Sequence, residues 1–147
     1  MQRSAGSSPV HDLPHEPVFF LDEDTSSRQV AEALREAGAA VRLHRELFTP
    51  GTDDRVWIRE VAAKGWAILS RDRRISRNEL ERQAVMQARA RKFTLRSKKN
   101  LTGTEMAAAF VKALPQMRTI IAAQPSPLFA RVYRDGTVRL QSGPGGR

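Results

Sequence analysis

Short apolar runs alternate with amphipathic stretches over the first half of the chain. The runs at residues 18–21 and 66–69 contain no polar residue, which is typical of strands that are buried on both faces. Residues 40–43 form a third strand-length run. The two stretches between the runs place apolar residues on one helical face and end at Gly38 and Gly65, and glycine often ends helices. An N-cap for the first of these helices is offered by Thr25, Ser26 and Ser27. This order, with short connections, predicts right-handed crossovers and a parallel sheet.

The second half of the chain adds further helix and strand patterns. A strand is predicted at residues 92–95, and a capping box at residues 102–105 opens a long helix that Pro115 should kink or divide. Asp135 and Gly136 lie between two apolar runs and predict a tight hairpin. Residues 76–89 are predicted to be a helix, and its inner face is expected to contain Leu80, Ala84 and Ala88.

The chain has the length of one domain, which we expect to span residues 18–141. Residues 1–17, which are rich in Ser, Pro and His, and residues 142–147 are expected to be flexible. The first 17 residues lack an apolar signal core, and no apolar run approaches membrane-spanning length. The absence of cysteine excludes disulfides, Cys-ligated zinc and thiol catalysis. We therefore expect a cytoplasmic protein without a membrane partner.

Charge is distributed unevenly along the chain. The net charge is +9, but residues 1–70 carry eight Lys or Arg against eleven Asp or Glu, a net of −3. Residues 71–99 carry eleven against three, a net of +8. An acidic half joined to a strongly basic segment indicates a polyanionic partner held beside an acidic cluster. The alternative is a solvated basic helix that binds nothing.

Three aspartates are predicted to meet at one edge of the sheet. Asp22 directly follows the first strand, Asp54 starts the helix after the second strand, and Asp72 lies just past the third strand. Ligands bind beyond the carboxyl ends of parallel strands. Glu81, on the next helix, is a candidate fourth acid, and Glu23 and Asp24 lie nearby in the sequence.

Clustered carboxylates repel one another, and a hard divalent cation such as Mg²⁺ or Mn²⁺ removes that cost. Such a site can activate water and stabilise charge on a phosphodiester. A hydroxyl at Ser70 could orient a carboxylate or a water molecule. The arginines next to Asp72 and on the following helix are expected to bind phosphates, and they are Arg71, Arg73, Arg74, Arg77 and Arg82.

Each acid also has a plain structural interpretation. Asp53 or Asp54 could be only a helix cap, although one residue alone can cap and the other stays available. Asp22 could be a turn residue, and Asp72 could pair with its arginine neighbours. Glu81 could be a solvated helix charge. Among the histidines, His44 ends the second strand and could border the site.

The chain resembles the PIN-like nucleases, and most closely the VapC-type toxins of toxin–antitoxin systems. The segments that carry the resemblance are residues 18–22, 33–38, 54–58 and 65–72. The resemblance implies a three-layer α/β/α sandwich, a Mg²⁺- or Mn²⁺-dependent ribonuclease, a neutralising antitoxin and often a dimer. It also implies metal-binding roles for Asp22, Asp54 and Asp72, with Glu81 as the further acid.

The chain departs from this family in one respect that concerns the metal. Many relatives carry another acid at the position of Arg74, so a second metal would bind weakly unless Glu81, Glu23 or Asp24 compensates. Two rival functions remain open. One is a receiver-like signalling domain, which would need a lysine at the end of a fifth strand. The other is a catalytically inactive PIN-like module that only binds nucleic acid or a partner.

Overall fold

The computed structural model describes residues 16–71, 75–98 and 100–141. Its elements, in chain order, are β2 (Val18–Leu21), α1 (Arg28–Glu36), β3 (Ala40–Leu43), α2 (His44–Leu47), α3 (Asp54–Ala63), β4 (Ala67–Arg71), α4 (Ile75–Ala88), β5 (Arg91–Arg96), α5 (Gly103–Ala123), β6 (Leu128–Tyr133) and β7 (Val138–Leu140). No helix in these ranges is long and apolar enough to cross a membrane.

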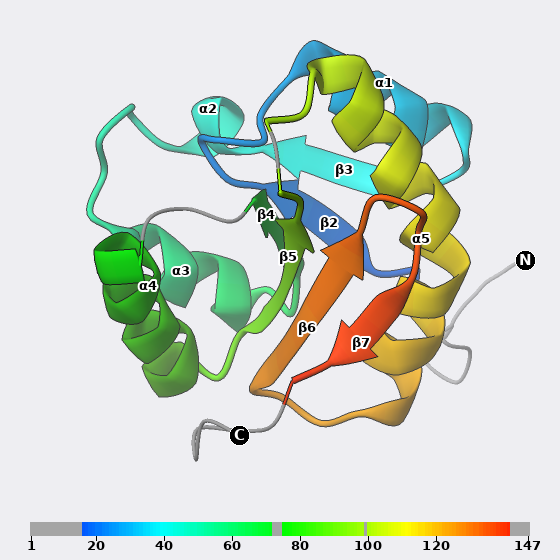
Figure 1. The fold of residues 1–147 in the computed structure, drawn as a ribbon. Coiled ribbons are helices and arrows are strands. Elements are labelled where there is room, and N and C mark those ends of the chain that lie inside the picture. Colours follow the sequence, from blue (N-terminus) through cyan, green and yellow to red (C-terminus); the bar gives the residue numbers. More distant parts are fainter. Residues whose placement is uncertain (1–15, 72–74, 99, 142–147) are drawn as a thin grey trace, which may run out of the picture.

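One six-stranded sheet, in the order β3-β2-β4-β5-β6-β7, forms the centre of the molecule (Figure 1). The first five strands in this order are parallel, and β7 alone runs antiparallel to β6. The predicted parallel sheet and the hairpin are therefore confirmed. The hairpin is not a separate unit, because β6 pairs along its whole length with β5. The sheet is consequently wider than the sequence pattern indicated.

Helices cover the sheet in two layers (Figure 1). On one face, α1 and α5 pack over a large apolar cluster that includes Phe19, Phe93 and Phe110. On the other face, α3 and α4 cover a smaller cluster around Phe20, Trp57 and other apolar side chains. This arrangement is the expected three-layer α/β/α sandwich, and burial of both sheet faces explains why the runs of β2 and β4 are continuously apolar.

Several local signals act as the sequence indicated. Ser27 caps α1, and its side chain accepts a hydrogen bond from the Val30 amide. Thr102 and Glu105 form the capping box of α5. Pro115 does not divide α5, which continues to Ala123. The helix is held on both sides of the proline by buried side chains, and this burial offsets the lost hydrogen bond.

The inner face of α4 agrees with the prediction at Ala84 and differs from it at Leu80. Leu80 is 68% exposed, whereas Glu81, Ala84 and Val85 are buried. The helix is therefore rotated so that a carboxylate, rather than a leucine, faces the sheet. The reason is a buried lysine on β5, described below, which the helical periodicity of α4 could not reveal.

Gly136 in the β6–β7 turn lies against α5. Its φ is +92°, and a Cβ built there would lie 2.5 Å from Lys112 Cβ. Gly136→Ala is therefore expected to lower the free energy of unfolding by roughly 2–3 kcal/mol, because strain and overlap act together. The matched control is Gly65→Ala, where φ is +76° and nothing lies within 4 Å of the added Cβ. Strain alone should cost that variant about 1 kcal/mol. If urea unfolding shows the same loss of unfolding free energy in Gly136→Ala and Gly65→Ala, close contact of Gly136 with α5 is refuted.

Candidate active site

Asp22 emerges at the carboxyl edge of the sheet, directly after β2. Its amide donates a hydrogen bond to the Leu69 carbonyl on β4 at 3.3 Å, which extends the pairing of the two strands by one residue. The residue is only 3% exposed. The predicted position at the strand end is confirmed, and the carboxylate is held inside the protein rather than in solvent.

One oxygen of the Asp22 carboxylate is occupied and the other is available. Oδ1 accepts hydrogen bonds from the Asp24 amide at 3.1 Å, the Thr25 amide at 3.1 Å and the Thr25 hydroxyl at 2.8 Å. Oδ2 accepts none from the residues that the structure describes. These bonds fix the orientation of the carboxylate, so that Oδ2 can serve a ligand outside the turn. This arrangement suits a cation that prefers oxygen ligands.

Glu81 on α4 is buried beside Lys92 on β5. Glu81 is 7% exposed and Lys92 is 6% exposed, and Lys92 Nζ lies 2.5 Å from Glu81 Oε1. The interpretation of Glu81 as a solvated helix charge is therefore wrong. Two charges inside the protein are tolerated because each neutralises the other. Lys92 is near the start of β5, so it does not provide the terminal lysine that a receiver-like domain would need.

Asp22, Glu81 and Lys92 interact electrostatically, and we call them the buried charge cluster. The pKa of Asp22 is raised from 3.8 to about 6, mainly by burial and next by the negative charge of Glu81. The hydrogen bonds from Thr25 and the positive charge of Lys92 act in the opposite direction. The cluster contains two carboxylates and one ammonium group, so ionised Asp22 lacks a full counter-charge within it. A divalent cation at Oδ2 would supply that charge.

Asp53 and Asp54 divide two roles between them. Asp53 is exposed and caps α3 by accepting from the Arg55 amide at 2.8 Å. Asp54 is half-buried, and its Oδ1 accepts from Trp57 Nε1 at 2.9 Å. The expectation that only one of the two residues caps the helix is confirmed, and a role for Asp54 in the site stays a prediction. Asp54 and Glu23 also line a common hollow of about 570 Å³ between the loop after α2 and helix α4.

His44 lies among aromatic side chains. Its ring contacts Phe20, Phe48 and Trp57, with centroid distances of 5.4–6.1 Å. Both ring nitrogens are buried and have no hydrogen-bond partner among the described residues. Burial lowers the pKa of His44, while the charges of Glu23 and Asp54 oppose that shift. His44 thus lies within the electrostatic influence of Glu23 and Asp54, and its ring is packed like an apolar side chain.

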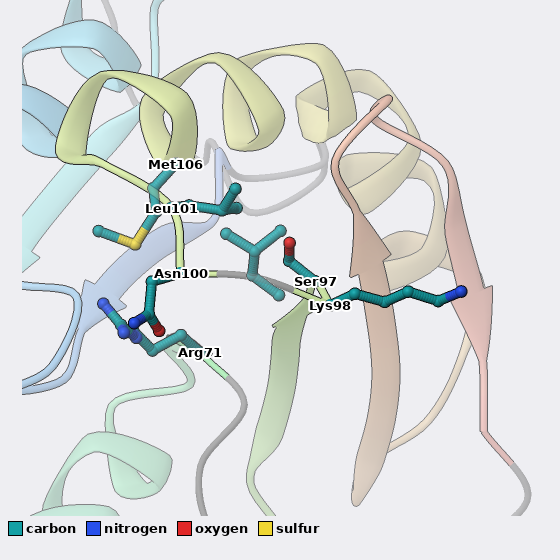
Figure 2. Close-up of a pocket in the computed structure, with 7 residues that line it drawn as sticks. Arg71, Ser97, Lys98, Asn100, Leu101 and Met106 are labelled. Carbon is teal, nitrogen blue, oxygen red and sulfur yellow. The ribbon is translucent and has the colours of Figure 1, made fainter.

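The predicted basic and hydroxyl residues occupy different surroundings. Ser70 is buried, and its hydroxyl donates to the Arg71 carbonyl at 3.3 Å. The Arg82 guanidinium lies 4.4 Å from the centre of the Phe129 ring. Arg71 lines a pocket of about 410 Å³ together with residues that follow β5 (Figure 2). Outside the described part of the chain lie Asp72, Arg73 and Arg74, and also the side chain of Arg77.

The structure therefore brings together some of the predicted acids. Within residues 16–71, 75–98 and 100–141, no three Asp, Glu or His side chains form a group that could hold one metal ion. Asp22 and Glu81 are neighbours, whereas Asp54 lies with Glu23 around the adjacent hollow. Because Asp72 is outside these ranges, the site of three aspartates stays a prediction.

Two residues of the site were not identified from the sequence. Thr25 was considered only as a helix cap, but an Asp after a strand often forms a side-chain turn with the residues that follow it, and here that turn includes Thr25. Lys92 was included in a strand without a role. A lysine within an otherwise apolar strand of a covered sheet is a weak signal for a buried counter-charge.

Comparisons with known proteins place the chain in a family. A family model described as "PIN like domain" matches residues 17–97, more than half of the 147 residues. The chain is 29% identical over 133 residues to a Mycobacterium tuberculosis (strain ATCC 25618 / H37Rv) protein named "Putative ribonuclease VapC45", covering 88% of this chain and 93% of that protein. No solved structure matches the chain significantly. The receiver-like alternative is thereby excluded, and the chain belongs to the PIN-like domain family.

Proposed function

We propose that this protein is a metal-dependent endoribonuclease and the toxin of a toxin–antitoxin pair. The observation that carries the proposal is the Asp22 carboxylate, which is buried beside Glu81 at the carboxyl edge with Oδ2 available. The relative named as a ribonuclease of the VapC type supports the choice of RNA and of a toxin. The partner expected from this assignment is a protein antitoxin, and a homodimer and a cytoplasmic location remain predictions.

The residues present fit a divalent cation of the Mg²⁺ or Mn²⁺ type. Carboxylate oxygens are the ligands that these ions prefer, and Mg²⁺ usually needs only one or two carboxylates with waters and phosphate oxygens. We assign Asp22 Oδ2 as the central ligand, and Asp54 and Asp72 as the further acids. When bound, the cation would activate water and stabilise the negative charge that develops on the phosphodiester.

The protein residues around the cation would each have a defined task. Thr25 and the Asp24 amide hold the Asp22 carboxylate in one orientation through the bonds to Oδ1. Lys92 neutralises Glu81, so that the second acid can lie near Asp22 inside the protein. Arg71, at the end of β4, would bind a phosphate next to the one that is cut. Arg73, Arg74, Arg77 and Arg82 are proposed to assist in phosphate binding, and Ser70 to orient a carboxylate or water.

The proposal predicts cleavage of RNA that depends on the metal. Wild-type protein should cut a mixed RNA with Mg²⁺ or Mn²⁺, should cut single-stranded DNA more slowly, and should lose activity in a chelator. Asp54→Asn and Asp72→Asn should each reduce the cleavage rate by at least about 100-fold, because each removes a metal ligand. The matched control is Asp53→Asn, which keeps the helix cap and removes the adjacent charge. Its rate should stay within about twofold of wild type.

The outcomes of this assay separate the remaining alternatives. RNA binding with no cleavage under any metal condition would select a catalytically inactive binding module. Equal losses in Asp53→Asn and Asp54→Asn would show that charge at the α3 terminus, and not a ligand at Asp54, is responsible.

A further inference from the structure

One face of the sheet beyond α4 is not covered by any helix of the described structure. Helix α5 packs on the opposite side of β5, β6 and β7, where it meets Phe93, Leu128 and other apolar side chains (Figure 1). Side chains alternate between the two faces of a strand. The uncovered face therefore carries the alternate residues, which are Thr94 and Arg96 on β5, Arg131 and Tyr133 on β6, and Arg139 on β7.

These side chains form a row that begins at the candidate active site. In the strand register, Ser70 is paired with Thr94, Thr94 with Arg131, and Arg131 with Arg139. Asp22 follows the Leu21–Leu69 pair, so it lies next to Ser70 at the start of the same row. Neighbouring strands are about 4.8 Å apart, which places Arg131 roughly 15 Å from the Asp22 strand. That distance corresponds to a few nucleotides of an extended single-stranded RNA.

The uncovered face is hollowed into a groove of about 940 Å³, which we call the basic groove. Five basic side chains line it, against the single acid Asp135, and they are Arg96, Lys98, Arg131, Arg134 and Arg139. Arg134 forms an ion pair with Glu105 at 3.0 Å. Arg131 forms no ion pair with an acid in the described part of the chain, and with the Gln141 amide turned over, the oxygen of this neutral side chain accepts from Arg131 at 3.2 Å. Tyr133 adds an aromatic ring among the cations.

The basic groove adjoins the pocket beside Arg71. Ser97 and Lys98 line both hollows. Figure 2 shows Lys98 extending away from Arg71 toward β7. A chain of phosphates that leaves the carboxyl edge at Asp22 would pass Arg71 first. It would therefore meet Lys98 next and then enter the basic groove.

We propose that the basic groove binds single-stranded RNA a few nucleotides away from the phosphate that is cut. Arg131 and Arg139 bind phosphates, and Tyr133 stacks with a base. A positively charged groove with an aromatic ring is the usual platform for single strands, because every base has a face that can stack. An acidic protein segment would use the arginines but would gain little from Tyr133. The position relative to the cut phosphate rests on the proposed function, whereas the binding itself does not.

The proposal is tested by binding in the absence of metal. A labelled twelve-nucleotide oligouridylate is titrated with full-length protein in chelator, and fluorescence anisotropy is measured at several salt concentrations. The double variant Arg131→Gln/Arg139→Gln should bind at least about tenfold more weakly, and its salt slope should fall by roughly 1.4, since each phosphate contact contributes about 0.7 for single strands. The matched control is Arg28→Gln/Arg59→Gln, which removes two exposed arginines outside the groove. It should change binding less than threefold.

The aromatic contact has its own pair of variants. Tyr133→Ala should weaken oligouridylate binding about tenfold, and Tyr133→Phe should restore it, because the ring and not the hydroxyl stacks on the base. Thermal unfolding of each variant shows whether its fold is intact. If Arg131→Gln does not fold, the charge test is repeated with Arg139→Glu, since Arg139 occupies an exposed strand position.

Each result bears on a separate statement. If the double variant Arg131→Gln/Arg139→Gln binds the oligouridylate as tightly as wild type does, the basic groove is not the RNA-binding site. This conclusion would hold even if metal-dependent cleavage is intact. Weaker binding by the groove variant, in a protein that never cleaves RNA, would support the groove and reject the proposed function. Displacement of the RNA by polyglutamate, with no effect of Tyr133→Ala, would assign the groove to an acidic protein instead of RNA.

Discussion

The Asp22→Asn variant is expected to lose RNA cleavage and, without metal, to be more stable than wild type at neutral pH. The amide oxygen can still accept the hydrogen bonds from Asp24 and Thr25 that Oδ1 accepts now. The negative charge that would hold a metal is gone. Loss of a central ligand should reduce the cleavage rate by at least about 1000-fold, because the remaining acids bind the cation weakly.

The gain in stability follows from the raised pKa of Asp22. The pKa is about 6 in the folded protein, against 3.8 as the ordinary value. Below pH 3.8 both states are protonated, and the residue has no effect. As the pH rises from 3.8 to 6, the unfolded chain loses the proton first, so folded wild type loses stability. Above pH 6 the full loss of unfolding free energy is present, roughly 3 kcal/mol. Asn has no such cost.

Urea unfolding of both proteins in chelator checks this prediction. Their free energies of unfolding should be similar near pH 4 and should differ in favour of Asp22→Asn at pH 7. Adding Mg²⁺ should stabilise wild type by about 2.7 kcal/mol at a hundred times the dissociation constant, and should leave the variant unchanged. A variant that is less stable than wild type at pH 7, or that cleaves RNA normally, would reject the role given to Asp22.

The Lys92→Met variant is expected to be strongly destabilised. It removes the ammonium group that lies against Glu81, and both residues are almost fully buried. Removing one partner of a buried ion pair typically costs about 3–5 kcal/mol, since the other charge is left without compensation. The pKa of Asp22 should also rise further, because Lys92 lowers it in the wild type.

A double variant separates loss of the charge partner from loss of packing. Glu81→Gln/Lys92→Met removes both charges and keeps two side chains of similar size, so it should recover at least half of the stability lost in Lys92→Met. Chemical unfolding of the two single variants and the double variant completes the cycle. If the losses are additive, Lys92 contributes through its packing, and the buried charge cluster has no electrostatic basis.

The local features of this protein were determined by the sequence. The strands β2 and β4 appear where continuous apolar runs predicted them, and Ser27 and Thr102 cap helices at the predicted turns. These features depend on the residues of one strand or one helical turn, whose periodicity and hydrogen bonds are local. The place of Asp22 at the carboxyl edge also followed, because it needs only a strand end and the parallel order of the sheet.

Tertiary structure alone decided which charged residues of different helices and strands become neighbours, and which face of each element is buried. Helical periodicity favoured Leu80 as the inner residue of α4, but Glu81 faces the sheet because Lys92 lies on the strand beneath it. The basic groove likewise exists only because β6 joins β5 in parallel and turns Arg131 and Tyr133 to the uncovered face. Pairs such as Glu81 and Lys92 leave no local pattern, since the stabilisation of a buried charge depends on a partner that the chain brings near by folding.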